Sequence, residues 1–141
     1  MKQFGTFVIN HWVLFVALLA VVAMFVMNIL KGRFLGFKEI KPAEAVQLLN
    51  HKDAIVVDVR DDNDFSTGHI LNAINLPLGV MEQRMDELEK YRSKPVIISC
   101  RTGQQSARAG MIMHRQGFTD VYKLAGGMMA WQSANMPVSK D

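Results

Sequence analysis

A strand, a loop and the start of a helix follow one another in Pro95-Val-Ile-Ile-Ser99-Cys100-Arg-Thr-Gly-Gln-Gln-Ser106. The apolar run Val96–Ser99 is typical of a strand that is buried on both faces of a sheet. A helix is expected from Ser106 to Gln116, and Gly117 then ends it. A strand that turns directly into a helix is the repeating unit of α/β proteins, so this stretch indicates that class.

The same alternation continues on both sides of this stretch. Ala54–Asp58 is a second continuous apolar run, and Met81, Met85 and Leu88 recur at helical spacing among charged neighbours. Strands that are joined by helices pair in parallel, so the sequence predicts an α/β domain over residues 39–141 with a parallel sheet covered by helices. The expected strands are 54–58, 73–76, 96–99 and 121–124, and the expected helices are 42–50, 81–88, 106–116 and a last one that opens at 126–127.

The first 38 residues have a different character. Phe7–Leu30 contains no Asp, Glu, Lys or Arg, and its 24 residues exceed the roughly 20 that a helix needs to cross a bilayer. A cleaved signal peptide usually has a shorter apolar run and a small-x-small cleavage site, and a buried core helix of this length would be unusual in so small a protein. The sequence therefore predicts one transmembrane helix at about 7–30, followed by a short basic linker to residue 38.

Charge separates the same two parts of the chain. Residues 1–38 carry four cations and no acid, whereas residues 39–141 carry the other 12 cations against all 13 acids. The near-neutral domain argues against a nucleic-acid partner. Lys31, Arg33, Lys38 and Lys41 follow the apolar run, so the positive-inside rule predicts that the C-terminal domain lies in the cytoplasm. The presence of a single cysteine excludes an internal disulfide and agrees with a reducing compartment.

Cys100 directly follows an expected strand, at the edge where open α/β sheets bind their ligands. A loop that turns around Gly103 into a helix can direct backbone N–H groups inward, at the positive end of the helix dipole. Such a loop favours a thiolate over a thiol, which would make Cys100 a nucleophile without a metal or a histidine base. The alternative is that Cys100 is a small buried apolar residue, as lone cysteines often are.

The loop Cys100-Arg-Thr-Gly-Gln-Gln-Ser106 resembles the active-site loop of the rhodanese family of sulfurtransferases. Three other stretches resemble motifs of that family in the same order, so the resemblance spans residues 57–131, and residues from about 39 fit its usual first helix. These stretches are Val57-Asp-Val-Arg60, Phe65-x-x-Gly68-His-Ile70 continued by Ala73-x-Asn75-x-Pro77, and Leu124-x-Gly126-Gly127-x-x-Ala130-Trp131. The resemblance implies a rhodanese-like three-layer domain.

The resemblance also implies a reaction. The Cys100 thiolate would take the outer sulfur of thiosulfate or of a persulfide donor, and a thiol acceptor would then remove it from the Cys100 persulfide. Arg101 would bind the thiosulfate oxyanion, or it is only a solvated loop charge; the Ser106 hydroxyl would donate toward sulfur, or it caps the helix. No metal or cofactor is implied. The predicted persulfide-binding loop comprises Arg101, Thr102, Gly103, Gln104, Gln105 and Ser106, and the predicted structural residues are Asp58, Arg60, Gly68, His69, Gly126, Gly127 and Trp131.

Two other functions compete with sulfur transfer. A phosphatase of the same fold would need the pattern Cys-x5-Arg, but Ser106 occupies the position of that arginine. A membrane-tethered docking or regulatory module would use the domain to contact an integral-membrane partner, and fold alone does not separate such a module from an enzyme. A single domain of this family behind one N-terminal span resembles bacterial inner-membrane proteins, which implies a single-pass location in that membrane.

Overall fold

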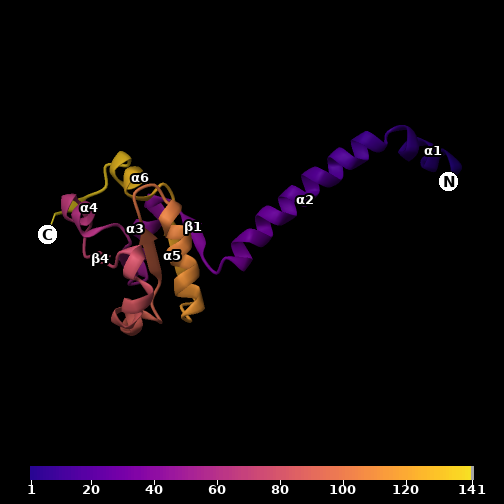
Figure 1. Cartoon of the computed structure of the whole chain (residues 1–141). Coiled ribbons are helices and arrows are strands. Elements are labelled where there is room, and N and C mark those ends of the chain that lie inside the picture. The colour runs from indigo at the N-terminus through magenta and orange to yellow at the C-terminus, as the bar shows by residue number, and fades with distance from the viewer. Residues whose placement is uncertain (141) are drawn as a thin grey trace. The chain divides into compact units, whose positions relative to one another are not determined.

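The computed structural model describes residues 1–140, without the side chains of residues 32–34, and it divides into the units Met1–Phe34 and Leu35–Asp141. The side chain of Arg33, part of the predicted basic linker, and Asp141 lie outside the described residues. The first unit consists of α1 (Lys2–Asn10) and α2 (Trp12–Phe34). The second unit contains the sheet and all other elements (Figure 1).

The predicted apolar helix is present as α2, and the shorter helix α1 precedes it. Trp12–Lys31 has a mean hydropathy of 2.9 over its most apolar window, none of which is buried, and is long and apolar enough to cross a membrane by length and composition. The range expected for the span, about 7–30, covers the end of α1 and most of α2, and His11 interrupts the helix between them. The backbone of His11 takes a non-helical ψ of 26°, and its Nδ1 lies 3.0 Å from the carbonyl oxygen of Phe7.

Five parallel strands form the central sheet of the second unit, four of which were predicted as apolar runs, whereas the strand Lys38–Ile40 was not. The order across the sheet differs from the order along the chain, so that β5 lies at the centre between β2 and β6. All four residues of β5 are buried, because helices cover both faces. From one edge to the other, the strands are β1 (Lys38–Ile40), β6 (Val121–Leu124), β5 (Val96–Ser99), β2 (Ile55–Asp58) and β4 (Ile74–Asn75).

Two buried clusters, one on each face of the sheet, make the domain three-layered. Ile98 belongs to the cluster that contains Met113 of α5, whereas its neighbour Ile97 belongs to the cluster that contains Trp131 of α6. Successive side chains of a strand point to opposite faces, so one short apolar run contributes to both clusters. The helices are α3 (Pro42–His51), α4 (Asp62–Thr67), α5 (Gln104–Arg115) and α6 (Gly127–Ser133), and a small antiparallel sheet joins β3 (His69–Ile70) to β7 (Val138–Ser139).

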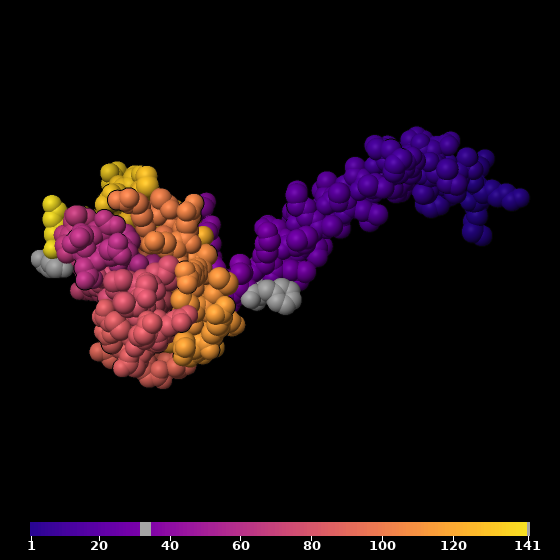
Figure 2. Space-filling model, viewed as in Figure 1, coloured from indigo at the N-terminus to yellow at the C-terminus, as the bar shows by residue number. Residues whose placement is uncertain are grey.

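The segment around Met85 is helical, but it is not the expected α-helix. Leu78–Val80 (η1) and Glu82–Tyr91 (η2) are 3₁₀-helices, although Met85 and Leu88 are buried as the apolar stripe predicted. These two residues are three apart, as are the ion-paired Arg84 and Glu87. A spacing of three places each pair on one face of the 3₁₀-helix. Figure 2 shows this segment side by side with α5.

The folded unit begins earlier than the predicted boundary at residue 39. It starts at Leu35. Phe37 is only 9% exposed, because its ring packs in the same buried cluster as Met113 of α5. The close approach needs a glycine at position 110, where a Cβ atom would lie 2.5 Å from the Phe37 ring. Residues 35–38 are therefore part of the domain and not of a linker.

Candidate active site

Cys100 lies directly after β5 and lines a cavity of about 230 Å³. Its side chain is only 1% exposed. The cavity is formed by the loop after β5 on one side and by the segment after β2 on the other. Its lining residues are Arg60, Asp61, Asp64, Cys100, Arg101, Thr102, Gln104 and Gln105.

The loop after Cys100 is shorter than the sequence suggested, because α5 begins at Gln104 and not at Ser106. Gly103 is the N-cap of this helix, with a left-handed φ of +98° that side chains rarely adopt. This conformation directs the Gly103 N–H at the sulfur, and the N–H donates to Cys100 Sγ over 2.9 Å. The first turn of α5 thus faces the thiol with its free amides, as predicted.

The surroundings of Cys100 act on its pKa in opposite directions. Burial raises the pKa of the thiol, while the Ser106 hydroxyl and the backbone amides of Ser106, Gly103 and Gln105 lower it. The net effect is a pKa below the ordinary value of a cysteine. The thiolate, which is the nucleophilic form, is therefore stabilised by hydrogen-bond donors of the loop and of the first helical turn.

Ser106 contributes to this effect from a fully buried position in the first turn of α5. The helix-cap alternative was wrong, because Gly103 is the N-cap. Among the described residues, Ser106 Oγ has no partner with the distance and angle of a complete hydrogen bond. The hydroxyl is nevertheless close enough to lower the pKa of the Cys100 thiol, so it can donate a hydrogen bond to the sulfur.

The start of α6 holds the loop after Cys100 in place through backbone hydrogen bonds. The N–H of Met128 donates to the carbonyl of Cys100 over 2.7 Å, and the N–H of Met129 donates to the carbonyl of Arg101 over 3.1 Å. Gly127 lies so close that a Cβ atom there would be 2.8 Å from the Arg101 carbonyl carbon. Gly127, one of the predicted structural residues, is therefore a point where α6 passes close to this loop. Trp131 is buried farther along α6, and its Nε1 donates to the carbonyl of Pro137.

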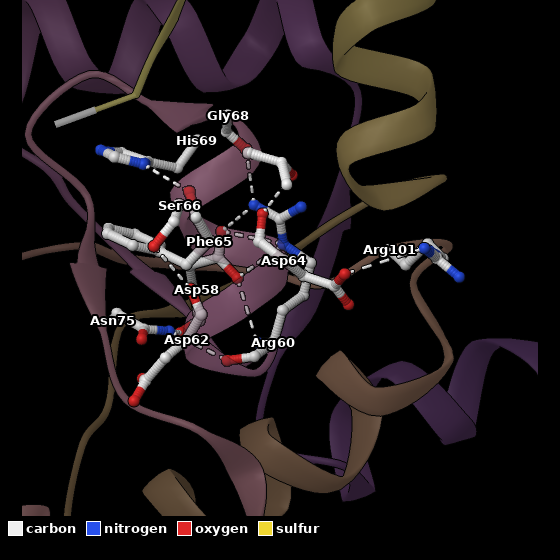
Figure 3. A network of polar contacts seen from close by, with 11 residues as sticks. Asp58, Arg60, Asp62, Asp64, Phe65, Ser66, Gly68, His69, Asn75 and Arg101 are labelled. Atoms are coloured by element: carbon white, nitrogen blue, oxygen red, sulfur yellow. Dashed lines mark hydrogen bonds and ion pairs between the residues drawn. The ribbon is translucent and has the colours of Figure 1, made fainter.

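A buried ion pair supports the opposite wall of the cavity. Arg60 donates through Nε and Nη2 to the carboxylate of Asp58, with an Nη2–Oδ2 distance of 2.7 Å. The same Nη2 donates to the carbonyl of Gly68, which follows α4, over 2.8 Å. The Asn75 side chain donates to the backbone carbonyls of Asp58 and Arg60. Figure 3 shows these contacts, which match the structural roles expected for this pair and for Gly68.

His69 also has the predicted packing role. Its ring stacks on Phe65 with a centroid distance of 3.7 Å, and its Nδ1 donates to the Phe65 carbonyl over 2.8 Å. These contacts join β3 to the end of α4.

At the mouth of the cavity, the predicted oxyanion-binding residue has an acidic neighbour. Arg101 is 72% exposed, and its Nη2 lies 3.9 Å from Oδ1 of Asp64 in α4. Asp61, the N-cap of α4, lines the same cavity. Sequence analysis missed both acids, because six residues are too few to show helical periodicity. The available signal was Asp61 after a strand end, a common N-cap position.

Comparisons with known proteins agree with this geometry. The sequence model of the family described as "Rhodanese-like domain" matches residues 41–134. The chain is 34% identical over 139 residues to YibN of Escherichia coli (strain K12), which is described as uncharacterized, and the match covers 98% of this chain and 97% of YibN. It is 35% identical over 105 residues to the thiosulfate sulfurtransferase GlpE of Pseudoalteromonas translucida, with 71% of this chain and 93% of GlpE covered.

Solved structures show the same fold. A rhodanese-like domain protein from Staphylococcus aureus is 29% identical, with a TM-score of 0.60 that covers 67% of this chain and 90% of that one. A rhodanese-related protein from Thermoplasma volcanium has a TM-score of 0.64 at 24% identity and covers 74% of this chain and 99% of its own. Because the four motifs, the fold and the family match coincide in one domain, this chain belongs to the rhodanese-like family.

Proposed function

We propose that this protein is a sulfurtransferase that carries a sulfane sulfur on Cys100. The observation that carries the proposal is the 2.9 Å hydrogen bond from the Gly103 amide to Cys100 Sγ, in a loop that lowers the pKa of the thiol. The similarity to proteins named thiosulfate sulfurtransferase supports the same reaction class.

In the first half-reaction, the Cys100 thiolate attacks the outer sulfur of a sulfane donor. With thiosulfate, the new S–S bond forms as the donor's own S–S bond breaks, and sulfite leaves with the bonding electron pair. The Cys100 persulfide then carries the negative charge on its outer sulfur, where the loop amides and the Ser106 hydroxyl are donors for it. In the second half-reaction, a thiolate acceptor takes the outer sulfur and restores the Cys100 thiolate.

Mass spectrometry of the full-length protein in detergent tests this proposal. Incubation with thiosulfate should add one sulfur atom, and cyanide or dithiothreitol should remove it. Cys100→Ser should abolish the mass increase and the turnover of thiosulfate with cyanide, while circular dichroism stays unchanged. Turnover that persists in this variant would disprove the mechanism, because the chain has no other cysteine. An unmodified wild-type protein with every donor would instead favour the docking module for a membrane partner.

The Ser106 position argues against phosphatase chemistry in this site. A phosphatase loop would need an arginine six residues after the cysteine to hold the phosphoryl oxygens, whereas this chain has a buried serine there.

We further propose that α2 anchors the domain to a bacterial inner membrane, with the domain in the cytoplasm. The proposal rests on the mean hydropathy of 2.9, on Lys31 and Lys38 after the apolar stretch, and on the match to YibN along nearly its whole length. The full-length protein should stay in the membrane pellet after alkaline carbonate washing. Protease added to spheroplasts should leave the domain intact, and its digestion from outside would overturn the orientation.

A further inference from the structure

The mouth of the Cys100 cavity contains two carboxylates to which the proposed reaction assigns no role. Asp61 and Asp64 line the cavity together with Arg101, and Asp64 forms the long ion pair with the Arg101 guanidinium. The two partners are 72% and 44% exposed, so this pair is weak and a bound ligand can replace either side of it.

Asp64 is nevertheless held in a fixed segment. The backbone carbonyl of Asp64 accepts a hydrogen bond from the Thr67 hydroxyl over 2.6 Å, and Arg60 binds the carbonyl of Gly68 just after the helix. Since Arg60 is buried and paired with Asp58, it anchors α4 from beneath. Figure 3 shows the Asp64 carboxylate directed from α4 toward Arg101 across the mouth.

The charges at the mouth disfavour a dianion. Among the described residues that line the cavity, Arg60 is neutralised by Asp58, which leaves Arg101 as one positive charge against Asp61 and Asp64. A donor with two negative charges is repelled by these carboxylates. It must also displace Asp64 from the Arg101 guanidinium before that group can bind it. A donor that carries an ammonium group beside its sulfane sulfur meets favourable carboxylates instead.

We propose that Asp64 is a positioning residue that sets the donor preference of this site by competing for Arg101. The site then favours sulfane donors that carry a positive charge near the sulfur, such as a persulfide beside an ammonium group or among basic residues, over thiosulfate. This inference rests on the proposed sulfur transfer and adds the class of donor to it.

Three donors that differ in charge test the preference. Thiosulfate carries two negative charges, methanethiosulfonate carries one, and thiotaurine is a zwitterion with an ammonium group and a thiosulfonate. In each case the Cys100 thiolate bonds to the outer sulfur, and sulfite or a sulfinate leaves with the electron pair of the broken S–S bond. The measured quantity is the second-order rate constant of persulfide formation in a single turnover, with the full-length protein in detergent.

Asp64→Asn should raise this rate constant for thiosulfate by about three- to tenfold, which is the effect of removing one charge a few ångströms from the ligand in water-like surroundings. The gain should be smaller for methanethiosulfonate, and thiotaurine should gain nothing or react more slowly. Because exposed charges are screened, high salt should reduce the differences. Asp62→Asn is the matched control: it removes the same charge from the same helix, but Asp62 does not line the cavity.

A double variant shows whether Asp64 acts through the arginine. In the Arg101→Ala background, Asp64→Asn should change the thiosulfate rate much less than it does in the wild type. Equal effects of Asp64→Asn on all three donors, or an equal effect of Asp62→Asn, would overturn the inference while sulfur transfer stands. A wild-type protein that takes sulfur from none of the three donors would overturn the proposed function and this inference with it.

Discussion

At the scale of single residues, the reactivity of Cys100 depends on donors that come from its own loop. Burial alone would raise the pKa of the thiol, and it is the Ser106 hydroxyl and three amides that bring it below the ordinary value. The amides belong to the backbone and cannot be removed by changing a side chain. Ser106 is therefore the position at which substitution can change the pKa without rebuilding the loop.

Ser106→Ala should raise the pKa of Cys100 toward its ordinary value of about 8.5. A lowered pKa means that the thiolate persists to lower pH, so the wild-type alkylation rate should reach its plateau at a lower pH than the rate of the variant. The measurement is the rate of reaction with iodoacetamide between pH 5 and 10. Thr at the same position keeps the hydroxyl and is the matched control. Coincident profiles for wild type and the Ala variant would show that Ser106 does not lower the pKa of Cys100.

The buried pair of Asp58 and Arg60 is expected to stabilise the fold without taking part in the reaction. Arg60→Ala leaves a fully buried carboxylate without its partner, which should cost about 3–5 kcal/mol of unfolding free energy in urea. The exposed pair of Arg84 and Glu87 is the comparison, and Arg84→Ala should leave the midpoint nearly unchanged. A small effect of Arg60→Ala would mean that water reaches Asp58 and that α4 is not anchored as described.

At the scale of elements, the active loop is shaped by its contact with the start of α6. Gly127→Ala would place a methyl group against the backbone of Cys100 and Arg101, at a φ of +57°. The loop must move to accept it, so persulfide formation should slow at least about tenfold, in line with the sensitivity of catalysis to small displacements. Gly79→Ala, where the space is open, should keep the rate. A fully active Gly127→Ala variant would show that the loop tolerates displacement.

Elements with strong local patterns were predictable, and elements without them were not. The strands β2, β5 and β6 lie within one residue of the expected bounds, because mostly apolar runs mark the strands that pass through the core. By contrast, β3 and β7 have two residues each and α4 has six, so their sequences are too short for any period to appear. Their positions follow from tertiary contacts such as the bond from Arg60 to Gly68.

The same distinction holds for the candidate site. Cys100 and its loop were predictable, because a strand end, a glycine and a helix start are adjacent in sequence. The meeting of Arg101 with Asp64 was not, because it joins two segments that are 37 positions apart and depends on how α4 is anchored. Local sequence thus indicated the proposed nucleophile, whereas the residues that would select its substrate required the fold.

At the scale of the whole molecule, the point where the domain begins has consequences for its isolation. Leu35–Ile40 contributes a strand to the sheet edge, where Lys38 pairs with Tyr122 and Ile40 with Leu124. Phe37 adds a buried ring to the cluster that contains Met113 of α5. The segment between the apolar helix and the domain is therefore short, since α2 ends at Phe34 and the folded unit starts at the next residue.

Residues 35–141 should accordingly form a more stable soluble domain than residues 39–141. The shorter fragment loses the Phe37 ring. Truncating a buried phenylalanine to alanine typically lowers the free energy of unfolding by about 3–5 kcal/mol. Urea unfolding followed by tryptophan fluorescence measures the difference, because Trp131 is buried next to the sheet. Phe37→Ala within 35–141 should reproduce most of the loss, whereas Leu35→Ala, at a side chain that is 37% exposed, should cost little. If the fragment 39–141 were equally stable, Phe37 would lie on the domain without supporting it, and the boundary would fall at residue 39 after all.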